Sequence, residues 1–108
     1  MADILYIVVP CYNEEEVLPE TSRRLRAKLE GLMAAGRISE QSRVLFVNDG
    51  SRDKTWNIIE MLHGECPLFS GIDLSRNRGH QNALLAGLMV SADRCDMAIS
   101  MDADLQDD

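Results

Sequence analysis

Residues 4–9 read Ile4-Leu5-Tyr6-Ile7-Val8-Val9, an unbroken apolar run rich in β-branched side chains. Such a run predicts a strand covered on both faces, because a strand with one solvated face would alternate apolar and polar residues. Pro10 follows and is predicted to end the strand, since proline has no backbone N–H to donate. A doubly covered strand is typical of a parallel sheet that has helices on both sides.

The pattern of a buried strand followed by an amphipathic helix recurs along the chain. From Glu15 to about Ala35, apolar residues fall on one helical face (Leu18, Leu25, Leu29 and Leu32), and Gly36 marks the expected end. The same reading predicts strands at 44–47, 68–74 and 97–101, and helices at 53–63 and 80–92. We therefore predict an α/β fold with an open, mainly parallel sheet and helices on both faces.

Length and composition restrict the class of protein. The 108 residues fit one domain, and 45% hydrophobic with 27% charged residues is a globular mixture rather than a disordered one. The formal net charge of −7 argues against nucleic acid as a partner, because binding to phosphate backbones depends on Lys and Arg.

The cysteines and the apolar runs indicate the cellular compartment of the chain. Cys11, Cys66 and Cys95 are widely spaced and form no CxxC pair, which argues against a zinc site and a disulfide framework. The start lacks the basic region of a signal peptide, and the apolar runs are far shorter than the about 20 residues that span a bilayer. We expect a cytoplasmic location with reduced thiols.

Polar side chains gather directly after each predicted strand. They are Tyr12, Asn13 and Glu14, then Asp49 and Asp53, then Arg76, Arg78 and His80, and finally Asp102, Asp104 and Gln106. Because the carboxyl ends of parallel strands share one edge of the sheet, and ligands bind in a crevice there, these residues predict one common site.

The chemistry of that site follows from the acid pair Asp102 and Asp104. Two carboxylates this close repel each other unless one is protonated or a cation binds, and oxygen ligands favour Mg²⁺ or Mn²⁺ over zinc. Mg²⁺ usually completes its shell with substrate phosphates, so a diphosphate is the expected ligand. Arg76, Arg78 and the helix that starts at His80 would supply positive charge and free N–H groups on the phosphate side.

Each feature also has an ordinary structural explanation. The acid pair alone is typical of a solvated tail, residues 48–51 of a turn with a helix cap, and residues 14–16 of acids at the first turn of a helix. Arg76, Arg78 and His80 alone are typical surface residues, and Cys11 is a typical small buried side chain. Their expected convergence on one edge favours a functional site.

Four motifs in order give the sequence a family resemblance. They are Val9-Pro10-Cys11-Tyr12-Asn13-Glu14-Glu15, Val47-Asn48-Asp49-Gly50-Ser51-Arg52-Asp53-Lys54-Thr55, Ser75-Arg76-Asn77-Arg78-Gly79-His80-Gln81 and Met101-Asp102-Ala103-Asp104-Leu105-Gln106-Asp107-Asp108. Together they resemble the family 2 glycosyltransferases, and within them the dolichol-phosphate mannose synthase and polyprenyl-phosphate glycosyltransferase branch. Asn48 stands where many members have a first acid.

The resemblance implies the Rossmann-like, nucleotide-binding half of a GT-A fold. By analogy, Pro10, Tyr12 and Glu14 line the base and ribose pocket, and Asp49 hydrogen-bonds the base. Asp102 and Asp104 would be the catalytic acids. Asp102 would lie near the ribose and the metal, and Asp104 and Gln106 would coordinate the Mg²⁺ or Mn²⁺ that bridges the donor diphosphate.

The implied reaction is inverting transfer of a sugar from a UDP- or GDP-sugar to a polyprenyl phosphate at the cytoplasmic face of a membrane. Family members continue well beyond the DxD motif, so the resemblance makes this chain a single nucleotide-sugar-binding domain, the donor half of the catalytic unit. We expect apolar surface left uncovered to favour self-association. Two alternatives stay open from sequence: a nucleotide-binding fragment without activity of its own, and a phosphoryl-accepting α/β domain.

Overall fold

The computed structural model describes residues 2–104, in which strands and helices alternate strictly. The elements are β1 (Leu5–Cys11), α1 (Leu18–Ala34), β2 (Arg43–Asp49), α2 (Thr55–Glu65), β3 (Phe69–Leu74), α3 (His80–Ser91) and β4 (Met97–Ser100). The predicted alternation and the α/β class are confirmed. Within the same residues, no helix is both long enough and apolar enough to traverse a bilayer.

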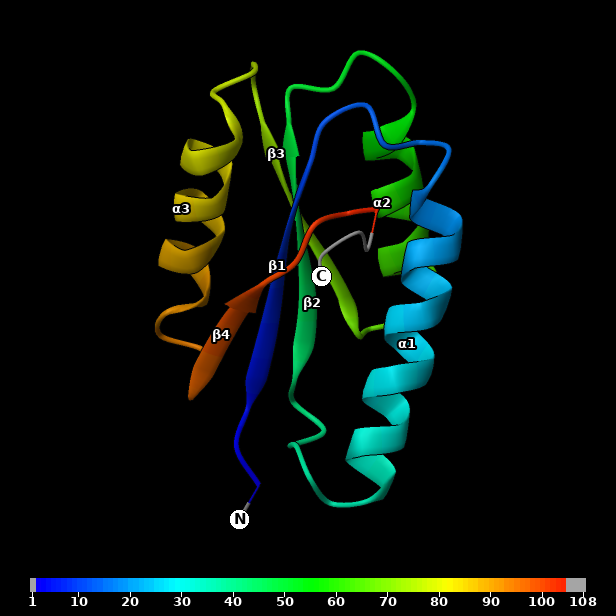
Figure 1. Ribbon diagram of the computed structural model, residues 1–108, viewed down its shortest axis with the longest axis vertical. Helices are drawn as coiled ribbons and strands as arrows, with labels where there is room; N and C mark the ends of the chain where they lie inside the picture. Colours follow the sequence, from blue (N-terminus) through cyan, green and yellow to red (C-terminus); the bar gives the residue numbers. More distant parts are fainter. Residues whose placement is uncertain (1, 105–108) are drawn as a thin grey trace.

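In the described part of the chain, the strands form one four-stranded parallel sheet in the order β3-β2-β1-β4 (Figure 1). β1 lies inside the sheet, with Ile7 opposite Val44 of β2 and opposite Ile99 of β4. Along the chain, β2 is added next to β1 and β3 next to β2, and β4 is then added on the other side of β1. Ligands bind at such a reversal of strand order, beyond the carboxyl ends of the strands.

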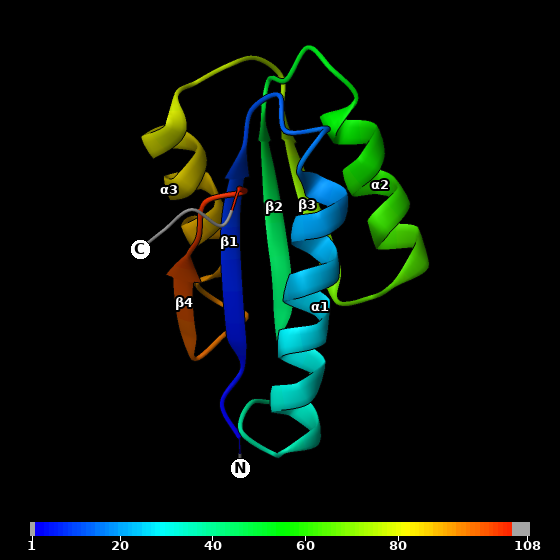
Figure 2. The ribbon, with the colours of Figure 1, turned by 45° about the vertical axis from the view of Figure 1, so that its right-hand side comes forward.

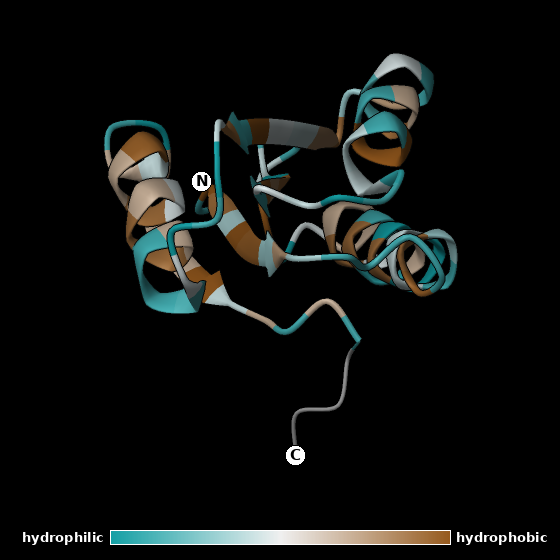
Figure 3. Cartoon of the chain, turned by 90° about the horizontal axis from the view of Figure 1, so that it is seen from above, coloured by the Kyte–Doolittle hydropathy of each residue, from teal (hydrophilic) through white to brown (hydrophobic). Residues whose placement is uncertain are grey.

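Helices cover the sheet on both faces, as Figures 2 and 3 show from two directions. On one face, α1 and α2 pack against a buried cluster that includes Ile7, Val9 and Phe46. On the other face, α3 packs through Ala83 against Val8 and its neighbours. Alternate residues of β1 therefore enter different clusters, which explains why the run at 4–9 is continuously apolar.

Pro10 does not end β1, contrary to the prediction. The strand continues through Pro10, opposite Val47, to Cys11, opposite Asn48. Successive residues of a strand direct their N–H groups to opposite neighbours, so residues 8 and 10 face the same side, that of β4. β4 pairs with β1 only as far as Val8. The missing N–H of Pro10 therefore falls beyond the end of β4, where no ladder bond is lost.

Other element boundaries shift by a few residues. α1 begins at Leu18 rather than near Glu15, and α2 begins at Thr55 rather than at Asp53, because the residues before both helices are engaged in contacts between loops. β4 ends at Ser100, although the N–H of Met101 still donates to the carbonyl of Val8 at 3.1 Å.

Candidate nucleotide-binding site

A pocket of about 320 Å³ opens at the carboxyl ends of β1 and β2, beside the start of α3. It is lined by Pro10, Cys11, Tyr12, Glu14, Asp49, Asn77, Gly79 and His80. The structure thus brings together five of the predicted residues from separate parts of the chain: Pro10 at the end of β1, Tyr12 and Glu14 in the loop that follows, Asp49 at the end of β2 and His80 at the start of α3. Figure 3 looks down the long axis of the molecule, and hydrophilic colours run along much of the loops.

Asp49 forms a wall of this pocket and is 3% exposed. Its Oδ1 accepts from the backbone N–H of Arg78 at 2.6 Å, and its Oδ2 accepts from the N–H of Gly79 at 3.0 Å. The side-chain amide of Asn77 also donates to Oδ2, at 3.2 Å. These bonds satisfy the buried carboxylate of Asp49 and fix the loop between β3 and α3. A carboxylate can accept about four hydrogen bonds, so Asp49 can still accept one from a ligand.

Gly50 allows the β3–α3 loop to come this close to the end of β2. Its φ of +68° lies in the left-handed region. A Cβ at this position would lie 2.2 Å from the backbone nitrogen of Asn77 and 2.4 Å from the carbonyl carbon of Arg76. Only glycine fits both the backbone conformation and the contact.

Glu14 links the pocket to the predicted acid pair. It is half-buried, and burial raises the pKa of its carboxyl above the ordinary value. The negative charges of Asp104, Asp53 and Asp102 raise this pKa further, in that order of effect. Asp102 and Asp104 do not line the pocket, but they lie close enough for their charges to act on a residue that does.

The segment that carries the acid pair is anchored to α1. Ala103 is 3% exposed, and its carbonyl accepts a hydrogen bond from the hydroxyl of Thr21. Asp102 and Asp104, on either side of this buried alanine, are exposed. The predicted metal ligand Gln106 lies outside the described residues.

The donor chemistry here fits a hard divalent cation. Glu14, Asp102 and Asp104 supply carboxylate oxygens, and the pKa of Glu14 is raised first by burial and then by the nearby negative charges. Among residues 2–104, no set of three or more His, Cys, Asp or Glu side chains is close enough together to enclose a metal. A bound cation would therefore need ligands in addition to the described acids, such as water or phosphate oxygens.

The basic residues of the β3–α3 loop divide between two positions. His80, at the first turn of α3, lines the pocket. Arg76 and Arg78 are exposed, and neither side chain lines the pocket. The backbone of Arg78, rather than its guanidinium, makes the contact with Asp49.

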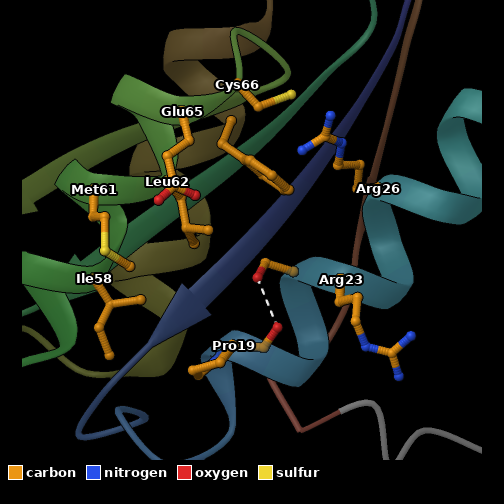
Figure 4. Close-up of a pocket in the computed structure, with 10 residues that line it drawn as sticks. Pro19, Arg23, Arg26, Ile58, Met61, Leu62, Glu65 and Cys66 are labelled. Atoms are coloured by element: carbon orange, nitrogen blue, oxygen red, sulfur yellow. Dashed lines mark hydrogen bonds between the residues drawn. The ribbon is translucent and has the colours of Figure 1, made fainter.

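A second hollow, of about 300 Å³, lies in the groove between α1 and α2 (Figure 4). Apolar side chains form much of its lining, including Ile58, Met61 and Leu62. Arg23 and Arg26 at its rim pair with glutamates of their own helix, at 2.6 and 3.0 Å. None of the residues predicted from sequence for the site lines this hollow.

Comparison with known proteins identifies the family. Residues 6–108 match the family model described as glycosyl transferase family 2. The chain belongs to this family.

Two curated relatives illustrate the similarity. The uncharacterized glycosyltransferase YkoT of Bacillus subtilis (strain 168) is 50% identical over 97% of this chain. The undecaprenyl-phosphate 4-deoxy-4-formamido-L-arabinose transferase of Shewanella sediminis (strain HAW-EB3) is 41% identical over 96% of it. The chain spans 31% and 29% of the length of these two relatives.

Solved structures confirm the GT-A-like arrangement of the fold. The mannosyltransferase PcManGT from Pyrobaculum calidifontis, in complex with GDP-Man and Mn²⁺, superposes with a TM-score of 0.72 at 20% identity. That match covers 96% of this chain and 28% of the mannosyltransferase. S. aureus TarS (residues 1–349) in complex with UDP superposes with a TM-score of 0.69 at 22% identity, over 94% of this chain and 27% of TarS.

The structure of this family 2 chain also adds residues that sequence reasoning gave no role. Asn77 lines the pocket and donates to Asp49, while Thr21 holds the acid segment. The glycine that ends the run Asn77-Arg78-Gly79 could have indicated a constrained loop after β3. In the structure, Gly79 has a φ of +94°. Thr21 lies in the helix and carries no comparable sequence signal.

Proposed function

We propose that the chain is the donor-binding part of an inverting, metal-dependent glycosyltransferase. It would transfer a sugar from a UDP- or GDP-sugar to a polyprenyl phosphate at the cytoplasmic face of a membrane. The observation that carries the proposal is the pocket at the carboxyl ends of β1 and β2, which combines Tyr12, Glu14 and Asp49 in one cavity. A concave pocket with few convergent polar groups is the usual form of a small-molecule site.

The pocket offers suitable groups for a nucleoside. The exposed ring of Tyr12 and the ring of Pro10 provide apolar surface for a base. The remaining acceptor capacity of Asp49 suits a base N–H, and the carboxylate of Glu14 suits a ribose hydroxyl. In this arrangement the diphosphate extends toward His80 and the start of α3, with Arg76 and Arg78 on the outer side.

Asp102, Asp104 and Gln106 are the residues that would hold Mg²⁺ or Mn²⁺. When bound, such a cation would neutralise the negative charge of the diphosphate leaving group. PcManGT, which shares the fold, is described in complex with GDP-Man and Mn²⁺. The role of this chain is to hold Asp102 and Asp104 near the pocket, through Ala103 and Thr21.

The acceptor is proposed from relatives and from chemistry. One relative, 41% identical, is named undecaprenyl-phosphate 4-deoxy-4-formamido-L-arabinose transferase. An acceptor phosphate is already an anionic nucleophile, so the reaction requires no strong general base, and the described residues include none that we assign to this role.

Calorimetric titration with UDP-sugars and GDP-sugars, with and without Mn²⁺, tests the proposal. We expect binding of one nucleotide class that strengthens at least about tenfold with Mn²⁺, which corresponds to about 1.4 kcal/mol. Asp104→Asn should remove most of the Mn²⁺ effect. Asp93→Asn, in an exposed acid beyond α3, is the matched control and should leave it unchanged.

Absence of nucleotide binding, or Mn²⁺ dependence that survives Asp104→Asn, would contradict the proposal. Sugar transfer to a short-chain polyprenyl phosphate is measured separately. Binding without transfer would support the alternative that these residues bind nucleotide without activity of their own.

A further inference from the structure

The loop before α1 and the loop before α2 are joined by hydrogen bonds that run in both directions. The N–H of Asn13 donates to the hydroxyl of Ser51 at 2.9 Å, and the N–H of Glu14 donates to the hydroxyl of Thr55 at 2.8 Å. The N–H of Glu15 donates to Oδ2 of Asp53 at 3.2 Å. We call the bonds between residues 13–15 and 51–55 the loop clasp.

The return bonds of the loop clasp satisfy backbone N–H groups just before α2. The N–H of Arg52 donates to Oδ1 of Asn13 at 2.8 Å, and the N–H of Lys54 donates to Oε1 of Glu15 at 3.3 Å. Lys54, at the N-cap of α2, makes no capping bond with its own side chain. The loop before α1 therefore supplies acceptors to backbone N–H groups just before α2, while the N–H of Thr55 donates to Oδ1 of Asp53 at 2.9 Å. Neither loop can move without leaving donors of the other unsatisfied.

Thr55 is the central member of the loop clasp. It is fully buried, and its hydroxyl accepts from the N–H of Glu14 while donating to Oδ1 of Asp53 at 2.5 Å. Asp53 directs its other oxygen to the N–H of Glu15. The hydroxyl of Thr55 thus has one fixed orientation, and it fixes the backbone at the residue whose side chain lines the pocket.

The backbone at Glu14 needs such a support. Asn13 has a φ of +55°, an uncommon conformation for a residue other than glycine. The Glu14 carboxylate also lies within the field of Asp104, Asp53 and Asp102, which would drive a loosely held side chain away from them. Bonds to the N–H groups of residues 14 and 15 fix the backbone from which this side chain extends, without occupying the carboxylate itself.

We propose that Thr55, supported by Asp53, is a positioning residue that holds Glu14 in the nucleotide pocket. The inference rests on the proposed function, since it concerns the same pocket. Neither Thr55 nor Asp53 lines that pocket, so both act through the backbone of residues 14 and 15.

Matched variants of buried hydroxyls test this role by calorimetry with UDP and GDP in Mn²⁺. Thr55→Val keeps the shape but loses both hydrogen bonds, and we expect nucleotide affinity to fall about tenfold or more. Thr55→Ser retains the hydroxyl and should bind within about twofold of the original chain. Ser42→Ala removes a fully buried hydroxyl that accepts from the N–H of Leu5, and it should lower stability without changing affinity.

Amide hydrogen exchange in the nucleotide-free chain provides an independent readout. The amide of Glu14 should exchange faster in Thr55→Val than in Thr55→Ser, while amides in the centre of β1 stay protected. Nucleotide affinity unchanged in Thr55→Val, or unchanged exchange at Glu14, would overturn the positioning role. If the original chain binds no nucleotide, the proposed function fails, and the exchange of Glu14 alone then decides whether Thr55 holds this loop.

Should Thr55→Val not fold, Ser51→Ala probes the same loop clasp, because it removes the hydroxyl that accepts from the N–H of Asn13.

Discussion

At the scale of single residues, burial suppresses the reactivity of the Cys11 thiol. Cys11 lines the pocket at the carboxyl ends of β1 and β2, yet the residue is only 1% exposed, and its Sγ donates to the carbonyl of Val9 at 3.3 Å. Burial raises the pKa of the Cys11 thiol far above its ordinary value, and the negative charge of Glu14 raises it further. A raised pKa keeps the thiol protonated at neutral pH, so Cys11 is a packing residue rather than a nucleophile.

We therefore predict that Cys11 resists alkylation in the folded chain. Cys95 is half-buried and should react first with iodoacetamide at neutral pH, whereas Cys11 and Cys66 are buried and should react only after unfolding in urea. Mass spectrometry of peptides after timed labelling measures the order. Labelling of Cys11 as fast as Cys95 in the folded chain would disprove it.

At the scale of elements, two helical glycines have different surroundings. Gly87 of α3 is buried, and a Cβ there would lie 2.4 Å from Cγ1 of Val8 and 2.9 Å from Cγ2 of Val47. Gly31 of α1 is exposed, and a Cβ there would meet nothing within 4 Å. Gly87 therefore permits close packing of α3 on β1 and β2, while Gly31 only lowers the helix propensity of α1.

The same substitution should have opposite effects at these two positions. Gly31→Ala should stabilise the chain by about 0.5–1 kcal/mol, because alanine loses less backbone entropy in a helix. Gly87→Ala should destabilise it by about 1–3 kcal/mol, because Val8 and Val47 are fully buried, β-branched and unable to move aside cheaply. Urea denaturation measures both. A change of the same sign in both variants would refute this difference in packing.

At the scale of the whole molecule, the β4 side of the sheet is less covered than the rest. Within residues 2–104, β4 lies at the edge of the sheet and pairs only with β1 (Figure 2). Its Met97 and Ile99 are 43% and 45% exposed. Both residues stand opposite the β1 residues Leu5 and Ile7, which belong to the cluster covered by α1 and α2. The helices on that face protect β1 but leave the side chains of β4 accessible.

An exposed edge strand with apolar side chains should make this chain self-associate. Ile99→Lys should reduce the associated fraction in sedimentation velocity without a large loss of stability, because the side chain is accessible. Met61→Lys, at a 52% exposed position of α2 remote from β4, is the matched control and should leave association unchanged. Equal association in Ile99→Lys and the unsubstituted chain would show that β4 is not the contact.

The elements of the fold could be predicted because their signals are local. The continuous apolar run of β1 and the leucine stripe of α1 each follow from side-chain periodicity within a short segment. The end of β1 could not be predicted in this way. Whether Pro10 is tolerated depends on the length of β4, a strand about 90 residues later in the chain.

The sequence by itself determined that strands and helices alternate and that Tyr12, Asp49 and the acid pair lie at or just after the ends of strands, because these features depend on patterns within a few residues. Only the tertiary structure decided which groups are free to meet a ligand. Asp49 is hydrogen-bonded to the β3–α3 loop, Thr55 is hydrogen-bonded to the backbone of Glu14, and Arg76 is exposed and does not line the pocket. The physical reason is that hydrogen bonding and burial of these groups depend on partners distant in sequence, which come together only when the sheet has formed.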